Sequence, residues 1–149
     1  MRHKGDIAQF RQIRVIRDLQ RIAAEGDAGR AALASREKDA ALNGSKRHRE
    51  SAEAGWSAAL SAPPVEVGAV ALWSQALRER DGAVRAATAE AGKARADLDG
   101  RTAELRAAIR RRELAHDLVK RTEKRRAADR DEAELQRATD LFLLRGFAT

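Results

Sequence analysis

The sequence predicts an all-α fold, a long antiparallel two-helix coiled-coil hairpin, and three observations carry this prediction. The 149 residues include only two prolines, which are adjacent at Pro63-Pro64. The segments on both sides of them are rich in Ala, Arg, Glu, Leu and Lys, which have high helix propensity. Charged residues make up 36% of the chain and aromatic residues 3%. Such a composition is poor for a globular core but sufficient for one narrow apolar seam per helix. We therefore expect a single domain, the hairpin, over 1–149.

The proline pair is where the chain is expected to turn. Proline lacks the backbone N–H and disfavours the helical conformation in the residue before it. We predict a first helix over 6–60, a turn over 61–65 and a second helix over 66–145, with Gly146 as its C-cap. A short linker makes the two helices antiparallel neighbours, so residues whose numbers sum to about 127 would face each other. The second helix would then overhang the first by about twenty residues.

Heptad spacing predicts which residues form the seam. In the second segment, steps of three and four residues give fifteen positions, twelve of them apolar: Val70, Trp73, Leu77, Arg80, Val84, Ala87, Ala91, Ala94, Leu98, Arg101, Leu105, Ala108, Arg112, Ala115 and Val119. The first segment repeats the pattern more loosely, through Val15, Leu19, Ile22, Gly26, Gly29 and Leu33, then Ala40, Ala52, Trp56 and Ala59 or Leu60 after a phase slip near Asn43-Gly44. A four-helix bundle broken at Asn43-Gly44 and Asp99-Gly100 is the alternative. The heptad runs through Gly100 without a change of phase, which favours the hairpin.

No residue pattern points to catalysis. The chain has no cysteine, no glycine-rich phosphate loop and no pair of histidines at the spacing of a helical metal site. The predicted register places His48 opposite roughly Glu79 and His116 opposite roughly Arg11, as solvated side chains. A coiled coil also lacks a cavity that could desolvate a general acid or base. We expect no enzymatic activity, cofactor, metal or small-molecule substrate. The longest uncharged run, 54–65, is shorter than the ~20 apolar residues of a membrane-spanning helix.

Basic residues crowd the two chain segments that the register brings together at the open end of the hairpin. We call this cluster the basic collar, and its candidate contact residues are Arg11, Arg14, Arg110, Arg111, Arg112, Lys120 and Arg121. Charge of one sign on both helices favours an acidic partner, either a protein cavity or nucleic acid. A generic solvated face is the alternative.

Two apolar regions stand out from this charged background. From Ala54 to Leu77 the only charged residue is Glu66, and this tip contains the candidate contact residues Trp56, Leu72, Trp73 and Leu77. Low charge with aromatics is typical of an interface, although the two tryptophans are better explained as plugs of the coiled-coil end. The second region is the C-terminal run with the candidate docking residues Leu141, Phe142 and Leu144. This run either docks on a partner, folds back or dimerises.

The pattern resembles the stalk proteins of type III secretion ATPases, the family shared by flagellar and virulence export systems. The resemblance rests on the chain length, the paired long helices without cysteine, and three segments: Arg11-Gln12-Ile13-Arg14-Val15, Val70-Ala71-Leu72-Trp73, and residues 125–135 with the pair Asp131-Glu132. The apolar run at 141–144 and the internal glycines depart from the family pattern.

This resemblance implies a non-enzymatic central stalk in the cytoplasm, peripheral at the base of the secretion apparatus. The basic collar would enter the pore of a hexameric secretion ATPase, and the tip would contact the membrane-embedded export gate. Secretion chaperones are further candidate partners. A basic coiled coil associated with nucleic acid, or a scaffold protein, is the alternative function. Acidic residues interleave with the arginines and no aromatics accompany them, which argues against base stacking or readout.

Overall fold

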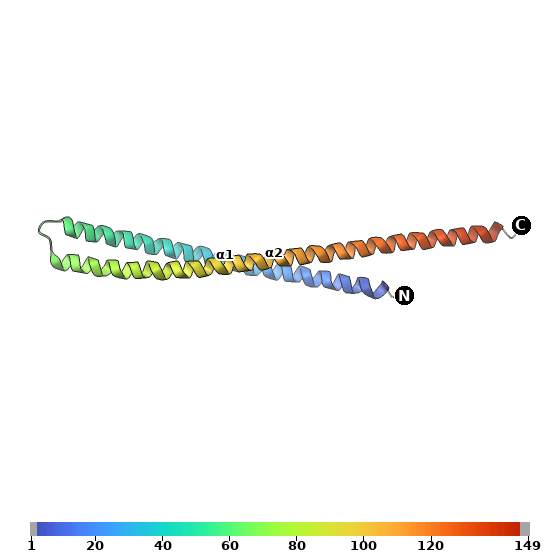
Figure 1. Ribbon diagram of the computed structural model, residues 1–149, viewed down its shortest axis with the longest axis horizontal. Coiled ribbons are helices and arrows are strands. Elements are labelled where there is room, and N and C mark those ends of the chain that lie inside the picture. Colours follow the sequence, from blue (N-terminus) through green and yellow to red (C-terminus); the bar gives the residue numbers. More distant parts are fainter. Residues whose placement is uncertain (1–2, 147–149) are drawn as a thin grey trace. The chain divides into compact units, whose positions relative to one another are not determined.

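The chain folds into two long α-helices that pack against each other, as a computed structural model shows (Figure 1). The structure describes residues 3–146, and the side chains of residues 7–145. Helix α1 spans His3–Ser61 and helix α2 spans Val67–Gly146. These bounds lie close to the predicted ones, and the predicted helical hairpin is confirmed. Asn43-Gly44 and Asp99-Gly100 both lie inside continuous helices, so the alternative four-helix bundle is excluded.

The loop at 62–66 contains the proline pair, as predicted. Before it, α1 ends with the amide of Ala62 donating to the carbonyl of Ala58 at 3.1 Å. The Ser61 hydroxyl donates to the carbonyl of Ser57 at 2.9 Å and so satisfies one of the last acceptors of the helix. After the prolines, the amide of Val70 donates to the carbonyl of Glu66 at 3.1 Å, which starts the hydrogen-bond ladder of α2.

The chain divides into two compact units, and each contains one part of both helices. Unit 1 consists of Met1–Ala23 and Arg106–Thr149, and unit 2 consists of Ala24–Leu105, including the loop. Ion pairs between the helices show the antiparallel register within unit 2. Arg49 Nε lies 2.6 Å from Asp81 Oδ1, and Arg95 Nη2 lies 2.7 Å from Asp39 Oδ1. The numbers of these partners sum to slightly more than the predicted 127.

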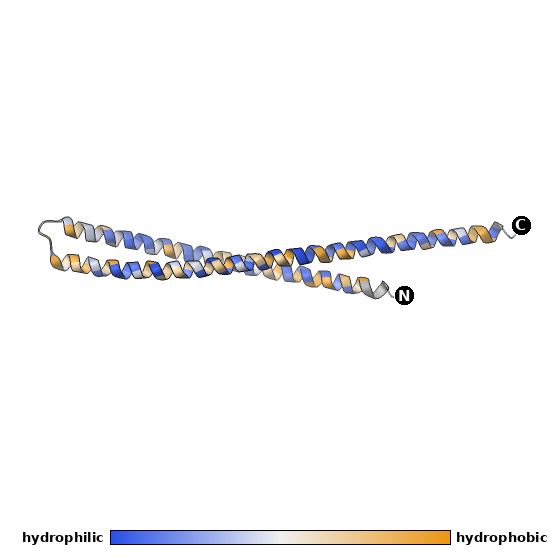
Figure 2. Ribbon diagram, in the orientation of Figure 1, coloured by the Kyte–Doolittle hydropathy of each residue, from blue (hydrophilic) through white to orange (hydrophobic). Residues whose placement is uncertain are grey.

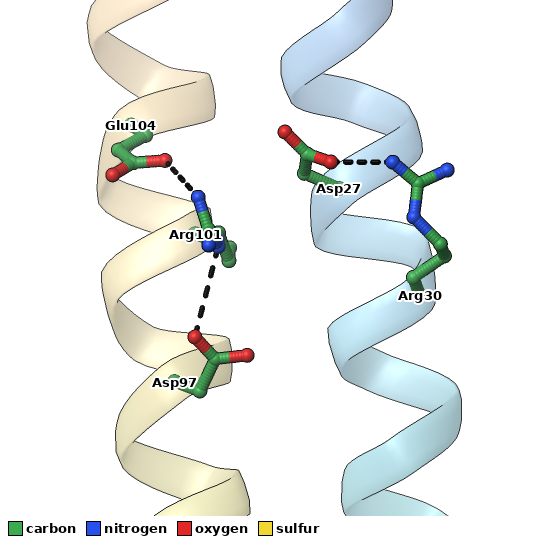
Figure 3. A network of polar contacts seen from close by, with 5 residues as sticks. All are labelled: Asp27, Arg30, Asp97, Arg101 and Glu104. Atoms are coloured by element: carbon green, nitrogen blue, oxygen red, sulfur yellow. Dashed lines mark hydrogen bonds and ion pairs between the residues drawn. The ribbon is translucent and has the colours of Figure 1, made fainter.

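The core of unit 2 is built from small side chains. Its buried residues are Ala31, Ser35, Leu42, Ala52 and Ala91. Half-buried Arg101 occupies one of the polar seam positions, where Figure 3 shows it between Asp97 and Glu104 of its own helix. The hydrogen bond from Arg101 to Glu104, together with nearby Asp97 and Asp27, raises the pKa of its guanidinium. The charge at this seam position is therefore offset by acidic residues on both helices.

The predicted α2 seam agrees with the burial pattern, whereas the predicted α1 seam is wrong over its first half. Of the fifteen predicted α2 positions, four are buried: Ala91, Ala108, Ala115 and Val119. Only Trp73 and Arg80 are exposed, and the others are half-buried. In α1, however, Val15, Leu19, Ile22 and Leu33 are exposed, at 52–61%. Later in α1, Ala52 is buried and Trp56 and Ala59 are half-buried as expected, but Ala40 and Leu60 are exposed.

Candidate partner-binding surfaces

The net charge of the chain is concentrated in unit 1. The sequence of unit 1 contains 18 lysines and arginines against 10 acidic residues, a net charge of +8. Unit 2 contains 12 basic and 13 acidic residues, a net charge of −1. Since both helices contribute to unit 1, the seven predicted residues of the basic collar all lie within one compact part of the molecule. Like charges at this density repel one another, and a partner of opposite charge would relieve that repulsion.

Two of the seven collar residues are paired within unit 1. Arg11 Nη2 donates to Glu123 Oε1 at 2.8 Å. Arg112 Nε donates to Asp18 Oδ1 at 2.6 Å, and His116 Nε2 lies 3.3 Å from the same oxygen. The hydrogen bond from Arg112, with a smaller contribution from His116, holds the pKa of Asp18 below its ordinary value. These contacts correct the predicted position of His116, which lies beside Asp18 rather than opposite Arg11.

The other five collar residues form no ion pair in the part of the chain that the structure describes. Arg110, Arg111, Lys120 and Arg121 are exposed, and Arg14 is half-buried. Because no described acidic side chain pairs with these five residues, their charged groups are available to bind an acidic partner molecule. The sequence alone does not distinguish the paired collar residues from the others, because pairing depends on the direction in which each side chain projects from the two packed helices.

The four predicted tip residues, all in unit 2, differ in exposure: Leu72 is the most exposed, Trp73 is less exposed, and Trp56 and Leu77 are half-buried. Leu72 is 68% exposed, whereas Trp56 and Leu77 are half-buried. Trp73 is 37% exposed, and its indole lies directly over Gly55 of α1. A Cβ built at Gly55 would meet three ring atoms of Trp73 at 2.8 Å. Gly55 is therefore a packing residue, and Trp73 belongs in part to the contact between the helices.

The exposed apolar surface of the tip is wider than predicted. Leu72 is joined by Leu60, Val65 and Val67, which are 42–80% exposed. Leu60 was predicted as an alternative seam position to Ala59, whereas Val65 and Val67 were not predicted because they flank the prolines and belong to no heptad position. The signal for all three was the low charge of the segment, in which Glu66 is the only charged residue.

The last turns of α2 expose the predicted C-terminal docking residues. Leu141, Phe142 and Leu144 are 62–78% exposed, together with Leu143. Figure 2 shows the hydrophobic colour of these turns next to the more hydrophilic part of α2 that precedes them. Every residue from Glu134 to Arg145 is exposed, so no other described part of the chain covers this run.

A fourth surface was not predicted. In unit 1, α1 exposes five large aliphatic side chains, which are Ile13, Val15, Ile16, Leu19 and Ile22. Sequence analysis placed three of them in the seam with α2. In the structure the buried aliphatic residue of this part of α1 is Ile7, and Asp18 contacts α2 through its ion pair with Arg112. By their spacing, Val15, Leu19 and Ile22 lie on one side of α1 with Ile16 at its border, and we call these four residues the α1 apolar face. Ile13 lies farther round the helix.

The described residues contain neither a metal site nor a membrane-spanning helix. No group of three or more His, Asp or Glu side chains is placed to hold a metal ion there. Within the same residues, neither helix has a stretch that is both long and apolar enough to cross a membrane.

Comparison with protein-family models, with curated proteins and with solved structures finds no match to this chain. The structure defines the chain as a helical hairpin that exposes both charged and apolar side chains.

Proposed function

We propose that this chain is a non-enzymatic stalk that couples the hexameric ATPase of a type III secretion system to its export gate. The observation that carries the proposal is the charge of unit 1, +8, with exposed arginines on α2 that form no ion pair with any side chain the structure describes. The helical hairpin and the sequence resemblance to the stalk family support it. In this proposal the molecule acts in the cytoplasm, at the base of the secretion apparatus.

The charge distribution favours an acidic cavity as the collar's partner. Arg110, Arg111 and Arg121 come from α2, and Arg14 comes from α1, so basic side chains leave both helices of unit 1. A ring of acidic residues around a pore would contact both helices together, whereas a flat surface would contact one side. Exposed charges gain little from one isolated ion pair, but a set of them steers and orients a partner of opposite charge.

The tip supplies the second contact of a coupling stalk, the one to the export gate. Leu72 is its most accessible predicted residue, and Leu60, Val65 and Val67 extend the surface around it. Exposed apolar side chains in a segment with a single charged residue, Glu66, are suited to a protein interface rather than to solvent. Secretion chaperones are the other candidate partners for this surface.

The test of the proposal is a charge reversal in the collar. The variant Arg110→Glu/Arg111→Glu/Arg121→Glu replaces three exposed side chains that form no ion pair among the described side chains, so its helicity should match the wild type. We expect its affinity for the secretion ATPase encoded in the same genome to fall at least about tenfold, with loss of any stimulation of ATP hydrolysis. Binding by the wild type should weaken with salt, because exposed charges are screened over ~8 Å at physiological ionic strength.

A matched control distinguishes the position of the charges from their number. Arg36, Arg47 and Arg80 are also exposed and pair with no acidic side chain within residues 7–145, but they lie in unit 2. The variant Arg36→Glu/Arg47→Glu/Arg80→Glu changes the net charge by the same amount and should leave ATPase binding near the wild-type value. Equal losses in both variants would show that net charge alone matters.

The exposed arginines also favour one alternative function, association with nucleic acid through phosphate contacts. Both affinities should therefore be measured for the wild type and both variants at two salt concentrations. Tight binding to DNA or RNA that is lost in the collar variant, without detectable binding to the ATPase, would refute the stalk proposal.

A further inference from the structure

One side of α2 in unit 1 carries arginine and leucine side chains together. At 3.6 residues per turn, six residues between positions 110 and 125 project into a sector of about 100°. We call them the α2 stripe, and all of them are exposed: Arg110, Arg111, Leu114, Leu118, Arg121 and Arg125. The buried residues Ala115 and Val119 mark the side of α2 that packs on α1, and the middle of the stripe lies about 110° round the helix from that side. The stripe is therefore open to solvent over about 22 Å of helix.

The leucines of the stripe are unusual for the middle of α2. Leu114 is 69% exposed and Leu118 is 42% exposed. Between Trp73 and Leu135, a segment that the structure describes completely, no other large apolar side chain of α2 is exposed. The two leucines are four residues apart and so lie on the same side of the helix. Because apolar surface is stabilised by its removal from water, a partner that covers both leucines gains free energy.

The arginines of the stripe are available to an anionic partner. None of the four forms an ion pair with a side chain that the structure describes, in contrast to Arg11 and Arg112 of the same unit. The acidic residues within 110–125 project outside the sector, although Asp117 borders it: Glu113, Asp117 and Glu123. The stripe itself is cationic and apolar only. Its partner must therefore be anionic and must also accept apolar side chains.

These two requirements together favour a lipid surface. Nucleic acid would bind the arginines through its phosphates but would leave both leucines in water. An acidic protein cavity would meet side chains all around the helix pair, whereas the stripe occupies one side of one helix. A bilayer surface is planar, with phosphates at the level that arginine side chains reach and an acyl boundary below them that leucines reach.

We propose that the α2 stripe binds the surface of an anionic phospholipid bilayer. Leu114 and Leu118 insert among the headgroups, and the four arginines contact lipid phosphates. The segment lies parallel to the membrane, as interfacial helices do, and does not span it. The attraction of basic side chains to an anionic leaflet grows with their number and falls off within a Debye length. The two leucines distinguish binding with insertion from adsorption by charge alone.

Membrane binding by the stripe goes beyond the proposed function and does not depend on it. Arg110, Arg111 and Arg121 belong to the basic collar as well, so an ATPase and a membrane would compete for them. Leu114 and Leu118 do not belong to the collar. Their replacement should weaken membrane binding and leave an electrostatic contact of the collar near its wild-type affinity, which separates the two contacts.

Vesicle flotation with the full chain tests the proposal. The wild type should bind vesicles of equal parts phosphatidylglycerol and phosphatidylcholine, should bind them more weakly as salt is added, and should not bind phosphatidylcholine alone. Leu114→Gln/Leu118→Gln should lower the partition coefficient at least about tenfold with unchanged helicity. The matched control Leu19→Gln/Ile22→Gln replaces two exposed side chains of the α1 apolar face and should have no effect.

A single tryptophan in the stripe reports insertion directly. In a Trp56→Phe/Trp73→Phe background, the emission of Leu118→Trp should shift to shorter wavelength with the anionic vesicles. Lipids brominated near the headgroup end of their acyl chains should quench it. Arg121→Lys/Arg125→Lys keeps the charge and should bind like the wild type, whereas Arg121→Gln/Arg125→Gln should bind more weakly.

The proposal would be overturned if the wild type did not bind the anionic vesicles. Binding that the leucine variant leaves unchanged, without a shift in the emission of the introduced tryptophan, would overturn it too, because adsorption would then rest on charge alone. DNA, RNA and the secretion ATPase belong in the same series of measurements. A leucine variant that loses binding to one of them, while the wild type ignores vesicles, would assign the stripe to that partner instead.

Discussion

Replacing Gly55 with alanine should destabilise the protein, although the same replacement at other helical glycines should stabilise it. Glycine in a helix interior costs about 1 kcal/mol relative to alanine, because it loses more conformational freedom on folding. At Gly55 this gain is opposed by a clash, since the added Cβ would lie 2.8 Å from Cδ2, Cε2 and Cε3 of Trp73. An ordinary contact between carbon atoms is about 3.5–4.0 Å.

The magnitude follows from these two opposing effects. Overpacking of this kind costs about 1–3 kcal/mol, whether the ring shifts outward or the helices separate. Subtracting the helix-propensity gain leaves Gly55→Ala between neutral and about 2 kcal/mol less stable than the wild type. Gly44, in the same helix and the same unit, has nothing within 4 Å of an added Cβ. Gly44→Ala should therefore raise the melting temperature by about 2–4 °C.

The assay is thermal unfolding followed by circular dichroism, with tryptophan fluorescence in a Trp56→Phe background to report on Trp73 alone. The Trp73 emission should shift toward that of solvent-exposed indole in Gly55→Ala and remain unchanged in Gly44→Ala. In a Trp73→Ala background the clash is absent, so Gly55→Ala should recover the stabilising effect, as a double-mutant cycle would show. An increase in melting temperature by Gly55→Ala as large as that by Gly44→Ala would refute the packing of Trp73 on Gly55.

Two further predictions concern the tip and the collar. Leu72→Asp should reduce binding to an export-gate protein without a loss of helicity, because Leu72 is largely exposed. Leu77→Asp should instead lower the melting temperature, because Leu77 is half-buried. A loss of helicity in Leu72→Asp would show that Leu72 belongs to the core. Asp18→Asn should destabilise unit 1 at neutral pH, where Asp18 is ionised and paired with Arg112. Because the folded state lowers the pKa of Asp18, its contribution is fully present above the ordinary value of 3.8 and is lost as the pH falls through the lowered value. The difference in melting temperature between wild type and Asp18→Asn should therefore disappear in acid, and a difference that persists there would exclude the ion pair as its cause.

The sequence predicted the hairpin and the α2 seam because both depend on strong local signals. The proline pair ends α1 regardless of how the helices pack, because proline cannot continue a helix. The heptad repeat of α2 is long enough to fix which of its residues face α1. The α1 seam was predicted wrongly because large aliphatic residues were assumed to face the partner helix. In unit 1 the larger aliphatics Val15, Leu19 and Ile22 face outward, while Asp18 takes a place beside Arg112 and His116. An ion pair across two helices has no periodicity of its own, so spacing alone could not reveal it.

The candidate surfaces were predictable in location but not in detail. Charge runs and uncharged runs are properties of segments, so the sequence located the collar, the tip and the C-terminal run. Which member of each group is accessible depends on the rotation of each helix about its axis. That rotation buries part of Trp73 over Gly55 and exposes Leu72 beside it. The same rotation pairs Arg11 with Glu123 and leaves Arg110 and Arg111 exposed, with no ion pair to the side chains that the structure describes.

The response to salt should differ between the two units, because their electrostatic balance differs. In unit 1, net charge +8 opposes packing, and Ile7 and Val119 are its only buried aliphatic side chains larger than alanine among the described residues. Screening by added salt should weaken repulsion among many charges more than it weakens the few ion pairs, since repulsion acts over longer distances. Unit 2 is nearly neutral, so salt should mainly weaken its ion pairs between the helices, such as Arg49 with Asp81.

Native-state hydrogen exchange at low and high salt, at a concentration where the chain is monomeric, can measure the two units separately. Amides of α1 over 7–23 should become more protected as salt is added. Those over 28–52 should stay constant or lose protection. The opposite outcome, a loss of protection over 7–23, would show that the pairs of Arg11 with Glu123 and of Asp18 with Arg112 outweigh the net repulsion. In that case the collar would be electrostatically satisfied within its own hairpin, and no acidic partner would be needed to offset its charge.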